Sequence, residues 1–404
     1  MRLILALALA FLISAPAPAA EEENLVVLVS IDGFRPDYLD RGLTPTLASL
    51  AETGVRSALR PAFPTVTFPN HYSLVTGLTP DHHGIVGNSM IDESLANPEH
   101  RHFRLSDAEA VDDPAWWEQG TPIWVTLHNN GRHSGVLFWP GSAGAISGVR
   151  PDHWLKWNAK MSYAARVDTA LEWLDQPQRP QFLALYFDHV DEEGHHWGPN
   201  SAQVDAAVAE ADAAIARLLA GLQRRGLGGT TNIIILSDHG MAKVEPDHFL
   251  FIDDFAPASD YRIVTSGALL GLIPNQGKSP SVEAALFAPK AHMTCARKSD
   301  LPARLRFGKN PRVPPILCLA ETGWMITTHA DAAKDAHPSL GTHGYDNSDP
   351  QMAALFVAHG PAFRRHITHP IFDNVDVYPL LARLLAVPPE PNDGRIEDIG
   401  DILR

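Results

Sequence analysis

The chain has 404 residues, 45% of them hydrophobic, and carries a formal net charge of −15. This length and composition fit one large α/β domain with an elaboration, or two domains, and exclude disordered and fibrous classes. Since an acidic surface repels polyanions, we expect neither nucleic acid polymers nor anionic membranes as main partners. A small phosphorylated substrate stays compatible with this charge, because a bound metal reverses the local sign.

Residues 1–20 have the pattern of a secretory signal peptide. Arg2 precedes an apolar run over residues 3–13, and an Ala-x-Ala cleavage pattern follows. The run is too short to span a bilayer, and no later stretch reaches membrane length. We therefore expect a periplasmic or secreted protein without a membrane anchor. An oxidising compartment favours a disulfide between Cys295 and Cys318, with two unpaired thiols as the alternative.

Four apolar runs predict strands buried on both faces, at residues 24–31, 182–187, 232–236 and 353–358. Between the second and third runs, a helical pattern starts at Ser201 and ends at Gly226. This alternation predicts an α/β fold with a mostly parallel central sheet and helices on both faces. Three of the runs end at Asp or Asp-His, at the edge where such sheets bind ligands.

A change of composition predicts the domain organisation. Residues 251–340 are rich in Pro and Ala and lack the buried-strand pattern. We expect them to form a smaller capping subdomain inserted into the catalytic core, which then comprises residues 21–250 and 341–404.

Candidate metal ligands follow two of the predicted strands. Asp238 and His239 are adjacent at a strand end, where both side chains can turn towards one cation; a turn whose Asp caps a helix is the alternative. Asp191 and His195 lie four positions apart, a spacing that presents oxygen and nitrogen ligands to one zinc ion on a helical turn. Spacing alone does not select this pair from its neighbours Glu192, Glu193 and His196.

Two further residues complete the candidate set. Asp32 ends the first strand, and His343 lies between Gly341 and Gly344, which permit close backbone approach. A capping Asp and a loop His are the alternatives. Together, three carboxylates and three imidazoles suit two Zn²⁺ ions, which would leave a small positive charge for a phosphodiester.

A proline-bounded turn over residues 64–71 offers the nucleophile. A threonine hydroxyl needs a metal or a base to become reactive, and a position at a helix start places it beside backbone donors. Spacing does not distinguish Thr67 from Thr65 here, and an ordinary hydroxyl-stabilised turn is the alternative to both.

Seven motifs in this order resemble the nucleotide pyrophosphatase/phosphodiesterases of the alkaline phosphatase superfamily. They cover nearly the whole chain after residue 20, and they are Ser-Ile-Asp-Gly-Phe-Arg (30–35), Pro-Thr-Val-Thr-Phe-Pro-Asn-His-Tyr (64–72), Gly-Ile-Val-Gly-Asn (84–88), Trp-Pro-Gly-Ser (139–142), Asp-x-x-Gly-His (191–195), Ser-Asp-His-Gly-Met (237–241) and Gly-Thr-His-Gly (341–344). The resemblance implies the alkaline phosphatase-like core, and it places leaving-group preference in the variable capping region.

The resemblance also implies a division of roles. One zinc would be bound by Asp191, His195 and His343. The other would be bound by Asp32, Asp238 and His239, and would bind Thr67 as the nucleophile. Asn88 would hold a phosphoryl oxygen together with the backbone amide after Thr67. Phe68 and Trp154 would form the walls of a slot for a nucleotide base.

The implied function is hydrolysis of nucleotide phosphodiester and phosphoanhydride bonds through a covalent Thr67 intermediate, with release of a nucleoside 5′-monophosphate. Alternatives are a phosphodiesterase for lysophospholipid or choline-type diesters, and a phosphonate hydrolase or phosphomonoesterase of the same superfamily. A non-catalytic binding protein is a further alternative, against which the complete set of ligands counts.

Overall fold

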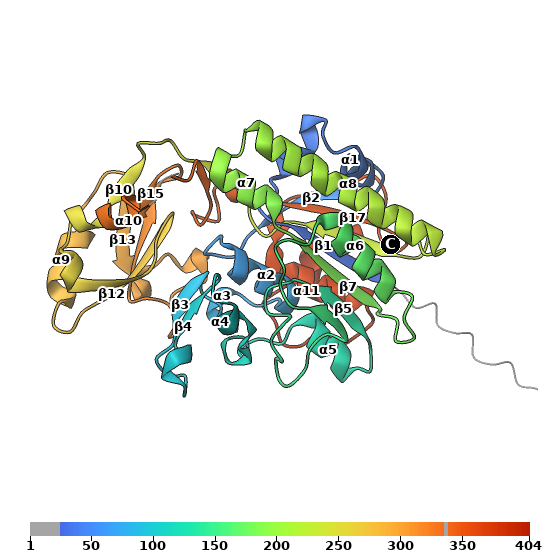
Figure 1. Cartoon of the computed structure of the whole chain (residues 1–404), viewed down its shortest axis with the longest axis horizontal. Helices are drawn as coiled ribbons and strands as arrows, with labels where there is room; N and C mark the ends of the chain where they lie inside the picture. Colours follow the sequence, from blue (N-terminus) through green and yellow to red (C-terminus); the bar gives the residue numbers. More distant parts are fainter. Residues whose placement is uncertain (1–24, 335–337) are drawn as a thin grey trace, which may run out of the picture.

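The computed structural model describes residues 25–334 and 338–404, so the predicted signal peptide lies outside the described residues. At its centre is a nine-stranded sheet of order β18-β2-β17-β8-β1-β7-β5-β6, with β19 paired to β2 (Figure 1). Its strands are β1 (Val26–Ile31), β2 (Val55–Arg60), β5 (Ser134–Leu137), β6 (His153–Leu155), β7 (Phe182–Phe187), β8 (Asn232–Leu236), β17 (Ala354–His359), β18 (Ile367–Thr368) and β19 (Phe372–Asp373).

The direction of β17 decides which strand ends meet. Strand β17 pairs antiparallel with β2 and β8, whereas the other pairs of this sheet are parallel. The predicted mostly parallel α/β class is therefore confirmed. His359, at the end of β17, pairs with Ile233 near the start of β8. The fourth predicted strand thus ends at the edge opposite to the ends of β1, β7 and β8.

Two layers of helices cover the sheet (Figure 1). On β1, Val26 and Leu28 pack into one apolar core, and Val27, Val29 and Ile31 pack into the other. This burial on both faces explains the uninterrupted apolar run. One core includes residues of α2 (Thr67–Thr76), α5 (Ile123–Asn129) and α11 (Val377–Leu384). The other includes residues of α1 (Pro45–Thr53), α6 (Tyr163–Trp173), α7 (His189–Trp197) and α8 (Ala202–Arg224).

Helix α8 begins as the sequence predicts. The Ser201 hydroxyl accepts the backbone N–H of Val204 at 3.2 Å and caps the first turn. The helix ends at Arg224, and Gly226 follows with φ of 72°. Within the described residues, no helix has both the length and the apolar character needed to cross a membrane.

The predicted insertion contains a sheet of its own, of order β11-β12-β14-β13, although its boundaries remain a prediction (Figure 1). Its elements are β11 (Tyr261–Thr265), β12 (Leu269–Pro274), α9 (Ser279–Phe287), β13 (Met293–Arg297) and β14 (Ile316–Ala320), with β10 (Phe249–Phe251), β15 (Met325–Thr327) and α10 (His329–Ala332) beside them. The remaining short elements are α3 (Pro80–His83), β3 (Ser89–Ile91), β4 (His102–Arg104), α4 (Ala108–Asp112), β9 (Ala242–Lys243) and β16 (Gly341–Thr342).

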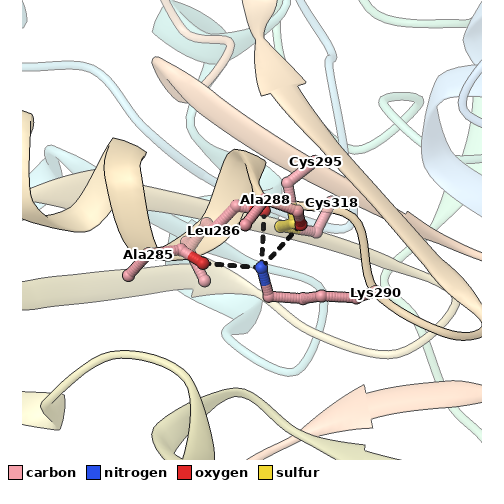
Figure 2. Close-up of a disulfide and its surroundings, with 6 residues drawn as sticks. All are labelled: Ala285, Leu286, Ala288, Lys290, Cys295 and Cys318. Atoms are coloured by element: carbon pink, nitrogen blue, oxygen red, sulfur yellow. Dashed lines mark hydrogen bonds between the residues drawn. A yellow bond between two sulfur atoms is a disulfide. The ribbon is translucent and has the colours of Figure 1, made fainter.

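A disulfide joins two neighbouring strands of the insertion, which confirms the expected pairing of Cys295 with Cys318. Cys295 on β13 lies directly opposite Cys318 on β14, and their sulfur atoms are bonded (Figure 2). Next to it, the Lys290 ammonium donates to the backbone carbonyls of Ala285 and Leu286 at the end of α9. The disulfide and this lysine therefore tie the insertion's own elements together.

Candidate metal centre and substrate pocket

The ends of three adjacent strands bring five of the predicted ligands together. Strands β1, β7 and β8 are neighbours and run parallel, so their carboxyl ends lie at one edge. Asp32 follows β1, and Asp238 and His239 follow β8. Helix α7 starts directly after β7 and carries Asp191 and His195.

Two glycines let the loops around this edge approach one another. A Cβ at Gly33, whose φ is 66°, would lie 3.0 Å from Asp191 Oδ1. A Cβ at Gly341 would lie 2.3 Å from the carbonyl oxygen of Gly194 on α7. Because neither contact tolerates a side chain, glycine is required at both positions. The second contact brings His343, the sixth predicted ligand, beside α7.

The first ligand group consists of Asp32, Asp238 and His239, whose ligand atoms all lie within 4.8 Å of one another. His239 Nε2 lies 2.9 Å from Asp238 Oδ2 and 3.3 Å from Asp32 Oδ1. All three side chains are buried, and these two carboxylate oxygens have no hydrogen-bond partner. Buried acceptors without a partner cost free energy, which a bound cation would remove.

The second group consists of Asp191, His195 and His343, again with ligand atoms within 4.8 Å. His195 Nε2 lies 3.3 Å from Asp191 Oδ2, and His343 Nε2 lies 3.6 Å from Asp191 Oδ1. Asp191 Oδ1 is also buried without a hydrogen-bond partner. The two groups adjoin, because the rings of His239 and His343 stack with centroids 3.6 Å apart.

Hydrogen bonds on the far side of each ring orient the three candidate histidine ligands. The Nδ1 atoms of His195, His239 and His343 lie 2.8, 2.9 and 2.9 Å from the carbonyl oxygens of Gly341, Gly240 and Thr65. A carbonyl only accepts, so each Nδ1 carries the proton and each Nε2 presents a lone pair to the site. This is the arrangement by which proteins orient metal-binding imidazoles.

The crowding of charges shifts the protonation of the same groups. Burial, followed by the charge of Asp238, raises the pKa of Asp32. Burial would also raise the pKa of Asp238, but the charges and hydrogen bonds of His239 and His71 together outweigh burial and lower that pKa. Burial, with His239 next in importance, lowers the pKa of His343 to about 3. His343 is therefore neutral near pH 7, as a metal ligand must be.

The two threonines of the predicted nucleophile turn have different surroundings. Thr67 is the first residue of α2, and its Oγ1 lies 3.3 Å from His239 Nε2 in the first ligand group. The Thr65 hydroxyl instead donates to the Tyr345 carbonyl at 2.9 Å and accepts the Gly344 N–H at 3.0 Å. The hydroxyl of Thr67 thus faces the candidate metal site, while that of Thr65 joins two loops.

Asn88 lies next to the start of α2. Its Oδ1 accepts the backbone N–H of Phe68 at 2.9 Å, and both residues line the same pocket as Thr67. The side-chain amide and the backbone amide after Thr67 are therefore adjacent at the pocket wall.

Two residues that the sequence reasoning missed, the buried His71 and the half-buried Tyr186, contact the candidate ligands. His71 Nε2 lies 2.8 Å from Ser30 Oγ, and its Nδ1 lies 2.9 Å from the Thr67 carbonyl and 3.3 Å from Asp238 Oδ2. Tyr186 donates its hydroxyl to Asp32 Oδ2 at 2.5 Å. His71 belongs to the motif over residues 64–72, and Tyr186 belongs to the predicted strand over residues 182–187. A residue that supports a ligand from another part of the chain has no characteristic spacing in the sequence, so neither role could be predicted.

A pocket of about 570 Å³ opens at the ligands. Its wall carries large apolar and aromatic side chains beside Thr67 and Asp32, and these include Phe68, Leu105, Phe138, Trp139, Leu155 and Trp157. No described residue of 251–340 is among its lining residues. The expectation that the insertion sets the leaving-group preference is therefore not supported by a contact between the insertion and the pocket. Many of the lining residues come instead from segments 105–112 and 138–159.

The structure moves the predicted second aromatic wall by three residues. Trp154 lies on β6, where the Arg150 guanidinium covers its ring at 5.0 Å, and it is not among the pocket-lining residues. Trp157 lines the pocket and is 46% exposed. The pocket lining therefore does not support Trp154 as the second wall, because Trp154 is paired with Val136 inside β6, whereas Trp157 follows the end of that strand.

Comparisons with known proteins agree with this geometry. Residues 26–346 match the family model described as type I phosphodiesterase/nucleotide pyrophosphatase. The chain is 38% identical over 392 residues to ectonucleotide pyrophosphatase/phosphodiesterase family member 3 of Bos taurus, with 94% of this chain but 44% of that protein covered. It is 35% identical over 384 residues to a bis(5′-adenosyl)-triphosphatase of Xenopus laevis, covering 94% of this chain and 82% of that protein.

A solved structure matches almost the whole chain. It is murine ectonucleotide pyrophosphatase/phosphodiesterase 5, an inactive threonine-to-alanine variant in complex with AMP. The TM-score is 0.89 at 33% sequence identity, and the match covers 94% of this chain and 100% of the murine one.

Proposed function

The chain belongs to the type I phosphodiesterase/nucleotide pyrophosphatase family, and from this premise we propose that it hydrolyses nucleotide phosphodiester and phosphoanhydride bonds with Thr67 as nucleophile. The observation that carries the proposal is the 3.3 Å separation of Thr67 Oγ1 from His239 Nε2, beside carboxylate oxygens left without partners. A threonine-to-alanine change in an inactive relative supports it.

The two ligand groups fit zinc, whose protein ligands are histidine nitrogens and carboxylate oxygens. When bound, two Zn²⁺ ions would offset phosphoryl charge and lower the pKa of the attacking hydroxyl. The Thr67 hydroxyl loses its proton to solvent as Oγ1 attacks phosphorus and forms a threonyl phosphodiester, while the leaving group departs with the bonding electrons. Water then cleaves that ester, which restores the Thr67 hydroxyl and releases a nucleoside 5′-monophosphate. Asn88, next to the Phe68 amide, holds a phosphoryl oxygen during both steps.

We expect the pocket to accept a nucleotide, because its lining carries aromatic side chains as well as the reacting Thr67. Phe68 follows the nucleophile directly and Trp157 lines the same pocket, and we expect their two rings to stack on a base. The AMP complex of the murine relative and the dinucleotide substrate named for the Xenopus one support this substrate class.

Charge favours a diester over a phosphate monoester, which carries an additional negative charge. Among the described residues, Lys156 is the one Lys or Arg that lines the pocket, and its ammonium is paired with Asp112 at 3.0 Å. A choline or lysophospholipid diester is the second candidate substrate, because Leu105 and Leu155 are 52% and 41% exposed at the pocket.

We further propose that the protein is exported to the periplasm or secreted. The signal-peptide pattern of residues 1–20 supports this, and so does the disulfide, which persists in oxidising compartments.

The test compares three nitrophenyl esters with the purified protein loaded with zinc. Turnover of p-nitrophenyl thymidine 5′-monophosphate well above p-nitrophenyl phosphate and p-nitrophenyl phosphorylcholine is the expected result. Preference for the phosphorylcholine ester would favour the second candidate, and preference for the monoester would contradict the proposal.

A further inference from the structure

A buried arginine lies behind the aromatic wall of the pocket. Arg166 of α6 is 1% exposed, although charged side chains are rarely buried unless they are paired. It is not among the pocket-lining residues. Its charge is balanced by Asp188, which accepts from Arg166 Nη1 at 2.9 Å and itself lines the pocket.

The guanidinium holds the wall by two kinds of contact. Arg166 Cζ lies 5.2 Å from the ring centroids of both Phe138 and Trp157, within range of cation–π attraction. Its Nη1 also donates to the backbone carbonyl of Tyr186 at 2.8 Å. A planar guanidinium can stack on rings while it donates hydrogen bonds in its own plane, which an ammonium cannot do. One side chain therefore contacts four pocket-lining residues from behind.

The wall residues need such support. Trp157 is 46% exposed and lies outside any helix or strand, so its ring has little else to fix it apart from Phe138 and Tyr186, with centroids 5.1 and 5.9 Å away. Phe138 has a φ of 65°, a left-handed conformation that is strained for an aromatic residue and persists only where the surroundings impose it.

We propose that Arg166 is a positioning residue that holds the Trp157 wall in place and thereby sets the preference for substrates bearing a base. The inference rests on the proposed nucleotide function, and it adds a residue that touches neither substrate nor metal ligand. A merely structural arginine would stabilise α6 and α7 without altering the choice between substrates.

The test compares p-nitrophenyl thymidine 5′-monophosphate with methyl p-nitrophenyl phosphate, which has the same leaving group and no base. In Arg166→Met, we expect KM for the nucleotide ester to rise about tenfold, with kcat/KM for the methyl ester within about twofold of wild type. Arg166→Lys keeps a charge for Asp188 and should show the same selective loss, even if the Met variant folds poorly. Arg217→Met is the matched control. Arg217 lies on α8 and pairs at the exposed surface with Asp168, which lies on α6 as Arg166 does.

A double-mutant cycle identifies the route of the effect. If Arg166 acts through the wall, Arg166→Met should leave the substrate preference unchanged once Trp157→Ala is present. An equal loss of kcat/KM with both esters would overturn the inference, and so would an Arg166→Met effect on substrate preference that persists in the Trp157→Ala background. Either result would mean that Arg166 acts through α7 and the candidate ligands on it. A wild-type enzyme that shows no preference for the nucleotide ester contradicts the proposed function itself. A wild-type preference that survives in both Arg166 variants contradicts the inference alone.

Discussion

His195 and His343 face each other through their Nε2 atoms, 3.1 Å apart, while the Nδ1 of each ring is bonded to a backbone carbonyl. With the proton held at Nδ1, the two facing nitrogens present lone pairs to the same point in space and have no proton to share. Such a contact is repulsive by itself. A cation between the two nitrogens and Asp191 would convert it into a ligand set.

Metal removal should therefore lower stability as well as activity. A chelator is expected to abolish turnover and to reduce the unfolding midpoint, because three clustered carboxylates and the facing imidazoles lose the cation between them. Free zinc at a hundredfold excess over its Kd should restore about 2.7 kcal/mol for one site. Differential scanning calorimetry with and without zinc measures this effect. An unchanged midpoint in fully demetallated protein would count against both ligand groups.

The loop contacts of Thr65 give a second prediction. Its hydroxyl bonds to Tyr345 and Gly344, and its carbonyl accepts from His343 Nδ1. Thr65→Val removes the hydrogen bonds of the hydroxyl. It should weaken zinc binding about 10- to 100-fold at the site that contains His343, which is the effect typical of removing a residue that orients a metal ligand. Competition with a chromophoric chelator measures the affinity. Thr65→Ser keeps the hydroxyl and serves as control; equal affinities in Val and Ser variants would refute the role.

The disulfide should matter for stability and not for catalysis. Replacing Cys295 and Cys318 together by alanine removes a cross-link of sequence separation 23, which typically stabilises by about 2–4 kcal/mol. Turnover of the nitrophenyl nucleotide should stay near wild type, because no described residue of 251–340 lines the pocket. Denaturant unfolding and steady-state kinetics give the two readouts. Lost turnover in a folded double variant would show that the insertion reaches the reaction.

Asp376 should make stability fall as pH rises. It is 3% exposed and accepts the Arg395 N–H at 2.7 Å, and burial raises its pKa from 3.8 to about 6. The folded state therefore binds this proton more tightly than the unfolded state. Its contribution is present at about pH 4 and is lost as pH rises through about 6.

The variant Asp376→Asn keeps an acceptor for Arg395 and removes the titration. Relative to this variant, wild type should lose on the order of 2–3 kcal/mol of unfolding free energy between about pH 4 and pH 7. Urea unfolding of both proteins at each pH measures the difference. If the difference in unfolding free energy between wild type and Asp376→Asn does not change between about pH 4 and pH 7, the prediction is wrong.

Local patterns in the sequence predict the sheet, and the clustering of the candidate ligands at its edge, for a physical reason. Strands buried on both faces leave long apolar runs, and a parallel sheet collects their carboxyl ends, so the positions of Asp32 and Asp238 in the chain suffice to place them together. The sequence does not predict that β17 is antiparallel to its neighbours, because a strand buried on two faces has the same apolar run in either direction.

Contacts between distant segments leave no such pattern. Trp154 and Trp157 are equivalent by residue type, and only the pairing of β6 with β5 shows which one turns to the pocket. The support that His71 and Tyr186 give to the ligands depends on side chains from different elements meeting in the core. The choice of Thr67 over Thr65 came from family resemblance, and the hydrogen bonds of Thr65 now give it an independent physical reason.

The most direct measurement of the central proposal is the turnover of Thr67→Ala together with its zinc content. The variant removes the attacking oxygen and one methyl group but keeps the three carboxylates and three imidazoles, so it should retain about two zinc ions per chain and near wild-type stability. Its turnover of p-nitrophenyl thymidine 5′-monophosphate should fall at least about a thousandfold. Turnover near the wild-type rate in a protein with full zinc content would contradict Thr67 as the nucleophile.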